Sequence, residues 1–75
     1  MQNIAVISQE DCVYCDKVKE LLWSKGLSYE EFDVNKHENI KLFFLRAGWT
    51  TVPQVFIDGK HIGGYRDLSE FFKEI

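Results

Sequence analysis

Apolar residues follow two different spacings along the chain, and the spacing predicts where strands and helices form. Runs of neighbouring apolar, β-branched and aromatic residues are typical of strands in the middle of a sheet. Such runs, or partly alternating ones, predict four strands, at 3–7, 28–34, 52–57 and around 61–62. Asp58-Gly59 has the composition of a tight hairpin turn, so the last two strands are expected to be antiparallel.

Between these strands, apolar residues recur three or four positions apart, which is the spacing of one helix face. The expected apolar faces comprise Tyr14, Val18, Leu21 and Leu22 in a first helix, Ile40, Phe43, Phe44 and Ala47 in a second, and Leu68, Phe71, Phe72 and Ile75 in a third. Lys25-Gly26 and Gly48 are expected to end the first two helices. The second and third helices are expected to begin at pairs with capping spacing, Asn35 with Glu38 and Asp67 with Glu70.

The resulting order, β-α-β-α-β-β-α, predicts an α/β fold. One right-handed parallel βαβ unit is followed by a helix and an antiparallel hairpin. Seventy-five residues with 45% hydrophobic content suffice for one small core, so residues 1–75 are expected to form a single domain.

The charge and hydropathy of the chain limit the kinds of partner that it is expected to bind. The net charge of −3, without clusters of Lys and Arg, argues against a nucleic-acid partner. The first residues lack the basic start and long apolar stretch of a signal peptide, and no apolar run has membrane-spanning length. A cytoplasmic monomer without a membrane partner is therefore expected.

Cys12 and Cys15 stand at the predicted start of the first helix, directly after the first strand. Unpaired N–H groups and the positive end of the helix dipole favour a thiolate there, and a thiolate is the attacking species in disulfide exchange. Glu10 and Asp11 act in the opposite direction, so we expect the pKa of the Cys12 thiol to be lowered only moderately. A cysteine pair with this spacing, beside a βαβ pattern, is typical of a thioredoxin-like redox motif.

Further motifs follow the cysteine pair at characteristic separations: Thr51-Val52-Pro53, then Gly63-Gly64 and Asp67. With Cys12-Val13-Tyr14-Cys15, they make nearly the whole chain similar to the glutaredoxin family. The resemblance implies a thioredoxin-like fold, with a four-stranded mixed sheet flanked by three helices. It also implies a glutathione-dependent oxidoreductase that reduces protein disulfides and glutathione mixed disulfides.

The resemblance implies a glutathione site as well. Pro53 is expected to follow a cis peptide bond and to face the cysteine pair, which turns the Val52 backbone outward to pair with glutathione. The start of the third helix is expected to bind the γ-glutamyl carboxylate, and Asp67 the ammonium group. The expected glutathione-binding residues are Tyr14, Thr51, Val52, Pro53, Gly64, Arg66, Asp67 and Arg46.

Two of these residues have alternative roles that do not involve glutathione. Asp67 can serve simply as a helix cap, and Tyr14 can cover the apolar face of the first helix. The chain also departs from the family pattern. Gln9 stands where the family usually has a lysine, so Arg46 becomes the candidate cation for the glycine carboxylate, with Lys36 and Lys41 as helpers. Val13 replaces the common proline between the cysteines.

By the family mechanism, the more exposed Cys12 is expected to attack the substrate disulfide. Cys15, one helical turn further on, is expected to resolve the mixed disulfide with a target protein. Glutathione is then the reductant, disulfide-containing or glutathionylated proteins are the clients, and ribonucleotide reductase is one candidate client.

Three alternatives remain open at this stage. Cys12, Cys15, His37 and His61 could form a zinc set, but the two histidines fall in separate elements, so no metal is expected. Val13 leaves room for a glutathione-ligated [2Fe-2S] carrier. A glutathione-independent electron donor to ribonucleotide reductase, reduced by thioredoxin reductase, would share the fold and the cysteine pair.

Trp49 and Trp23 have no role in these motifs. Trp49 is expected near the rim of the site, where it either recognises a target protein or packs against the second helix. Trp23 lies off the main apolar face of the first helix and is expected to pack only partly.

Overall fold

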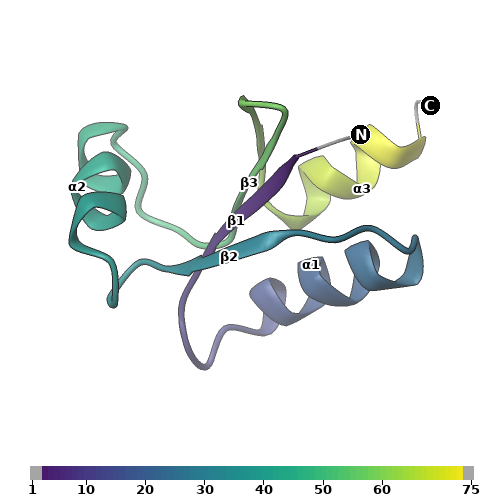
Figure 1. Cartoon of the computed structure of the whole chain (residues 1–75), viewed down its shortest axis with the longest axis horizontal. Helices are drawn as coiled ribbons and strands as arrows, with labels where there is room; N and C mark the ends of the chain where they lie inside the picture. Colours follow the sequence, from purple (N-terminus) through teal and green to yellow (C-terminus); the bar gives the residue numbers. More distant parts are fainter. Residues whose placement is uncertain (1–2, 74–75) are drawn as a thin grey trace.

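The computed structural model describes residues 3–73. Its elements follow the predicted order along the chain (Figure 1). Their bounds are β1 (Ile4–Ser8), α1 (Val13–Ser24), β2 (Glu30–Asp33), α2 (Glu38–Arg46), β3 (Gln54–Ile57), β4 (Lys60–Gly63) and α3 (Tyr65–Lys73). No helix among these residues is long and apolar enough to cross a membrane.

The four strands form one mixed sheet in the order β2-β1-β3-β4. β1 runs parallel to β2 and antiparallel to β3, and β3 pairs antiparallel with β4. This arrangement confirms the predicted thioredoxin-like fold. Ile7 near the end of β1 lies opposite Gln54 at the start of β3. The loop that follows β1 and the Pro53 segment that precedes β3 therefore meet at the same edge of the sheet.

The sheet is covered on both faces. Ile4 and Val6 belong to a core that includes buried residues of α1 and α3, whereas Ile7 packs with Phe44 of α2. Successive side chains of a strand point to opposite faces, so alternate residues of β1 enter different cores. Figure 1 shows α2 on the other side of the sheet from α1 and α3.

The first helix buries a different side chain from the one expected in its first turn. Cys15, Val18 and Leu22 are its buried residues, while Tyr14 is 58% exposed. Cys15 packs as a small apolar side chain and takes the inward position, which turns Tyr14 toward the solvent. The expected placement of Tyr14 on the buried face of this helix was therefore wrong. Trp23, expected to pack partly, is 79% exposed.

The predicted start of the second helix was also wrong. Asp33 accepts a hydrogen bond from the backbone N–H of Asn35 at 2.8 Å, which holds these residues in a turn after β2. The helix begins only at Glu38, and its N-cap residue His37 makes no side-chain capping bond. β2 is correspondingly shorter than the predicted 28–34.

The third helix begins two residues before the expected cap. α3 starts at Tyr65, so Asp67 lies within its first turn rather than at the N-cap. Its Oδ2 accepts a hydrogen bond from the backbone N–H of Gly64 at 3.1 Å. This is the reciprocal half of a capping box, in which a first-turn side chain reaches back to the N-cap N–H. Ile75, predicted on this helix face, lies outside the described residues.

Candidate redox site

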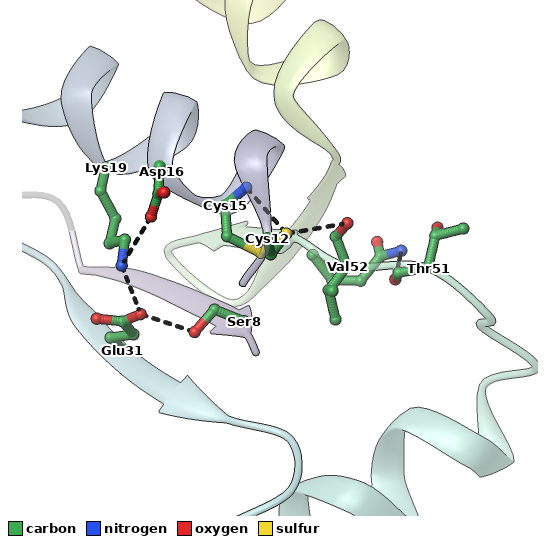
Figure 2. The surroundings of a disulfide bond; sticks show 9 residues. Ser8, Cys12, Cys15, Asp16, Lys19, Glu31, Thr51 and Val52 are labelled. Atoms are coloured by element: carbon green, nitrogen blue, oxygen red, sulfur yellow. Dashed lines mark hydrogen bonds and ion pairs between the residues drawn. A yellow bond between two sulfur atoms is a disulfide. The ribbon is translucent and has the colours of Figure 1, made fainter. Parts of the chain in front are cut away.

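The two cysteines form a disulfide at the start of α1, with their Cα atoms 5.2 Å apart. Cys12 is the N-cap residue, and its Sγ accepts a hydrogen bond from the backbone N–H of Cys15 at 3.1 Å (Figure 2). Cys12 is partly exposed, whereas Cys15 is 1% exposed. An incoming disulfide or thiol can therefore reach the sulfur of Cys12 and not that of Cys15.

The Val52-Pro53 segment lies beside this disulfide. The peptide bond between Val52 and Pro53 is cis, as predicted. The carbonyl oxygen of Val52 is 3.8 Å from Sγ of Cys12. A dashed line joins these two atoms in Figure 2. A disulfide sulfur carries no proton, so this distance records proximity rather than a hydrogen bond. Because β3 begins only at Gln54, the backbone of Val52 lies outside the strand ladder.

A cleft of about 860 Å³, here called the large cleft, opens on one side of this segment. It brings together seven of the eight predicted glutathione-binding residues, namely Tyr14, Thr51, Val52, Pro53, Gly64, Arg66 and Asp67. In the wall of this cleft, the backbone of Gly63 lies close to the side chain of Asp67. Gly63 has a φ of 121°, and a Cβ atom there would come within 2.8 Å of Cγ of Asp67. Glycine at this position therefore leaves room for the Asp67 carboxylate at the start of α3.

A second cavity of about 340 Å³, here called the small cleft, contains Cys12 in its wall. Thr51 and Val52 line both clefts, so this backbone separates them. Gln9 and Lys41 also line the small cleft, whereas Arg46 lines neither cleft. The structure thus places Lys41, rather than the favoured Arg46, in the wall of the cleft that contains Cys12.

Lys36, the other cation considered for this role, is engaged elsewhere. Its Nζ lies 3.0 Å from a carboxylate oxygen of Glu10, and both side chains are exposed. The hydrogen bond that Lys36 donates to Glu10 raises the pKa of Lys36 above its ordinary value. Lys36 therefore faces the acidic loop that precedes Cys12.

A charged network adjoins the disulfide on the side of β2 (Figure 2). The buried Ser8 hydroxyl donates to Oε2 of Glu31 at 2.7 Å, and Lys19 donates to the same oxygen at 3.1 Å. The hydrogen bond from Ser8 is the main reason why the pKa of Glu31 is lowered. The hydrogen bond to Glu31 in turn raises the pKa of Lys19, and Asp16 lies 3.6 Å from the same ammonium. The network ties α1 to β1 and β2 beneath the cysteine pair.

The alternative zinc set is not assembled. His37 packs edge-on against Phe32, while His61 stacks on Trp49 and bonds to Gln54. Within residues 3–73, no group of three or more Cys, His, Asp or Glu side chains is placed to hold a metal ion.

Several residues in the large cleft were not predicted. The ammonium group of Lys17 lies 5.9 Å and 5.8 Å from the ring centres of Tyr14 and Tyr65. Gln54, which is 7% exposed, lines the same cleft. Gln54 had a signal in the sequence, because it is the one polar residue in the apolar run 52–57. Lys17 had none, since a helical lysine is usually a solvated charge.

Of the two roles considered for Trp49, packing against the second helix is confirmed, and recognition of a target protein stays a prediction. Its ring packs against Phe43 and Phe44 of α2, with centroids 5.5 Å and 6.0 Å away. The same side chain lines the large cleft.

Curated relatives match nearly the whole chain. Glutaredoxin 3 of Escherichia coli is 45% identical over 73 residues, a match that covers 91% of this chain and 83% of that protein. Hybrid peroxiredoxin hyPrx5 of Haemophilus influenzae is 45% identical over 71 residues, covering 95% of this chain. The chain spans only 30% of the length of that protein.

Solved structures share the fold. A buckwheat glutaredoxin–glutathione complex superposes with a TM-score of 0.82 at 31% identity, covering 97% of this chain and 70% of that one. NrdH-redoxin from Escherichia coli superposes with a TM-score of 0.83 at 19% identity, covering 97% and 93%, and this likeness concerns the fold alone.

The family model for glutaredoxin matches residues 4–62, a range that includes both cysteines and the Val52-Pro53 segment. Membership in this family supports thiol–disulfide oxidoreductase chemistry at the cysteine pair. This chain belongs to the glutaredoxin family.

Proposed function

We propose that the chain is a glutathione-dependent thiol–disulfide oxidoreductase that reduces protein disulfides and glutathione mixed disulfides through Cys12 and Cys15. One observation carries the proposal. The accessible sulfur of the pair lies beside the carbonyl oxygen of Val52, on the backbone that separates the two clefts. A disulfide substrate with a peptide backbone would meet the attacking sulfur and a free stretch of backbone at the same place.

Glutathione fits this arrangement as a short extended peptide. Its cysteine would pair with the Val52 backbone, which lies outside the strand ladder, in the manner of an added strand. The γ-glutamyl end would occupy the large cleft, where the N–H groups of the first turn of α3 favour its carboxylate. The carboxylate of Asp67 would receive the ammonium group. The buckwheat glutaredoxin–glutathione complex supports the use of this ligand.

The glycine carboxylate would extend into the small cleft. Lys41 lines that cleft and Arg46 does not, so we assign the carboxylate to Lys41 instead of Arg46. The uncharged Gln9 in the same wall can donate a hydrogen bond but cannot supply a second positive charge.

The reaction with a glutathione mixed disulfide needs only Cys12. Its thiolate attacks the sulfur of glutathione, which forms an S–S bond to Cys12 and releases the client thiolate to take up a proton. A second glutathione thiolate attacks the glutathione sulfur of this adduct, forms oxidised glutathione and regenerates the Cys12 thiolate. The N–H of Cys15, which points at Cys12 Sγ, stabilises negative charge on that sulfur.

A protein disulfide requires both cysteines. Cys12 attacks one sulfur and forms a mixed disulfide with the client, and the second client thiol is released. The Cys15 thiolate then attacks Cys12 Sγ, which frees the first client thiol and leaves the Cys12–Cys15 disulfide seen in the structure. Two glutathione molecules return this disulfide to the dithiol and leave as oxidised glutathione. Ribonucleotide reductase is a candidate client, and a cytoplasmic location belongs to the same proposal.

A second candidate function is electron donation without glutathione, from thioredoxin reductase to ribonucleotide reductase. Gln9 favours it, because an uncharged amide stands where the family usually has a lysine, which leaves the positive charge of the small cleft to Lys41. Asp67 at the start of α3 favours the glutathione-dependent function. The fold does not discriminate, since the chain superposes on a glutaredoxin and on NrdH-redoxin equally well. The [2Fe-2S] carrier would need a second copy of the chain, with Cys12 and glutathione from each copy holding the cluster.

Replacing each cysteine in turn tests the proposed roles. We expect Cys12→Ser to abolish turnover of both a glutathionylated peptide and a protein disulfide. Cys15→Ser should still turn over the glutathionylated peptide and should lose reduction of the protein disulfide. If Cys15→Ser were inert toward the glutathionylated peptide, the assignment of Cys12 as sole nucleophile for that substrate would be wrong.

A further inference from the structure

The side chain of Gln54 connects the Thr51-Val52 segment, which is proposed to face the substrate, with the edge strand β4. It is 7% exposed and directly follows Pro53. Its Nε2 donates to the carbonyl oxygen of Thr51 at 3.0 Å, and its Oε1 lies 2.6 Å from Nε2 of His61. Both ends of a buried amide are therefore satisfied, one by the loop before β3 and the other by β4.

The chemistry of the partners fixes the direction of these bonds. A backbone carbonyl can only accept, so the nitrogen of the Gln54 amide must face Thr51 and its oxygen must face His61. That oxygen also only accepts, which requires His61 to carry a proton on Nε2. The donors thus run in one direction, from His61 to Gln54 and from Gln54 to Thr51.

The imidazole of His61, the first donor in this chain of hydrogen bonds, packs against two aromatic rings. His61 lies opposite Phe56 in the pairing of β3 with β4, and the two ring centres are 5.2 Å apart. Trp49 stacks on the imidazole with a centroid distance of 4.5 Å and an angle of 22° between the rings. In this arrangement the imidazole of the exposed His61 points its Nε2 at Oε1 of Gln54.

We propose that Gln54 and His61 are positioning residues, which hold the Thr51-Val52 backbone in the geometry that a bound peptide needs. This inference rests on the proposed function of that backbone. Thr51 and Val52 belong to no strand, so the sheet ladder does not fix their conformation. The bond from Gln54 to the Thr51 carbonyl supplies the missing constraint. Neither side chain needs to touch the reacting sulfurs.

The expected consequence is a change in binding rather than in chemistry. Without the constraint, a substrate must order the Thr51-Val52 backbone as it binds, and this cost weakens its binding. A loss of this kind raises KM and leaves kcat nearly unchanged. One lost hydrogen bond of ordinary strength corresponds to an increase in KM of about three- to tenfold.

The test compares Gln54→Met, His61→Phe and the double variant with the wild-type chain on a glutathionylated peptide, coupled to glutathione reductase. Methionine keeps the length of Gln54, and phenylalanine keeps an aromatic ring against Trp49. We expect each single variant to raise KM about three- to tenfold. Since both residues act through one chain of bonds, the double variant should raise KM no further than Gln54→Met alone.

Three controls separate positioning from general stability. His37→Phe replaces the other histidine, which lines neither cleft, and should leave KM unchanged. Reduced protein should react with 2,2′-dithiodipyridine, which has no peptide backbone, at the wild-type rate in every variant. His61→Gln restores a donor toward Gln54 without a ring and should return KM toward the wild-type value. The comparison of His61→Phe with His61→Gln decides the question even if Gln54→Met does not fold.

Three results would overturn the inference: a wild-type KM in His61→Phe, additive effects in the double variant, or an equal loss of reaction with 2,2′-dithiodipyridine. A wild-type chain inactive on the glutathionylated peptide would instead contradict the proposed glutathione dependence. The same variants would then be compared by KM for a protein disulfide, which must pair with the same backbone. An unchanged KM for the protein disulfide in these variants would overturn the positioning role independently.

Discussion

At the scale of single residues, the two sulfurs differ in exposure, and their proposed roles in attack and resolution follow from that difference. The Cys-x-x-Cys motif was sufficient to predict the pair and its place at the start of a helix, because the spacing and the preceding apolar run are both local. Which cation lines the cleft that contains Cys12 was not predictable in the same way. Lys41 and Arg46 both lie on α2, and the position of that helix relative to the sheet decides that Lys41 lines the small cleft.

The choice between these two cations can be tested directly. We expect Lys41→Gln to raise the KM for glutathione about two- to fivefold, the range for an ion pair that remains partly solvated. Arg46→Gln is the matched control, because it removes the same charge from the same helix outside both clefts, and it should leave KM unchanged. Steady-state kinetics with glutathione as the varied substrate provide the measurement. The reverse result would restore the assignment of the glycine carboxylate to Arg46.

A second prediction at this scale concerns the network of Ser8, Glu31 and Lys19. Ser8→Ala removes a buried donor to the Glu31 carboxylate and should cost about 1 kcal/mol of unfolding free energy at pH 7. For a domain of this size, that loss lowers Tm by roughly 4–8 °C.

The loss of stability in Ser8→Ala should depend on pH, because the pKa of Glu31 is lowered in the folded protein. A carboxyl group whose pKa is lower in the folded state stabilises the fold at pH values above its ordinary pKa. The contribution is lost as the pH falls through the folded-state pKa. The difference in Tm between the wild type and Ser8→Ala should therefore shrink when thermal unfolding is followed at successively lower pH. A difference that stays constant down to pH 3 would show that Ser8 contributes by packing alone.

At the scale of elements, the sequence located every helix and strand that residues 3–73 form, and its errors lie at element bounds, most clearly at two helix starts. Asn35 was expected to cap α2, but the Asp33 carboxylate takes its N–H and extends the turn. Asp67 was expected at the N-cap of α3, but it bonds backward to Gly64. Both errors arise because an Asp or Asn side chain can bond to several nearby N–H groups, and the spacing alone does not select one.

Asp67 has an observed role at the start of α3 and a proposed role in binding glutathione, and two variants separate these roles. Asp67→Ala removes the bond to Gly64 and should lower the unfolding free energy by about 1 kcal/mol. Asp67→Asn keeps an acceptor for Gly64 and should retain most of that stability. If the carboxylate also binds the ammonium group of glutathione, Asp67→Asn should still raise the KM for glutathione severalfold. Thermal unfolding and steady-state kinetics on both variants give the answer, and a wild-type KM in Asp67→Asn would leave Asp67 only its helix role.

At the scale of the whole molecule, the site is a product of the sheet topology. β1 and β3 are antiparallel neighbours, which brings the loop after β1 and the segment before β3 to one edge of the sheet. The resemblance to the glutaredoxin family predicted this meeting, because it implied that Pro53 faces the cysteine pair. The division into two clefts and the bridge from His61 to Thr51 were not predictable, because they depend on contacts between side chains of separate elements.

The central claim is that glutathione supplies the electrons, and the electron source can be compared directly. The oxidised chain would be incubated with NADPH and either glutathione plus glutathione reductase or thioredoxin reductase alone, and appearance of the dithiol would be followed over time. We predict rapid reduction by the glutathione system and little or none by thioredoxin reductase. Reduction by thioredoxin reductase, together with resistance to glutathione, would contradict the claim and favour the glutathione-independent electron donor.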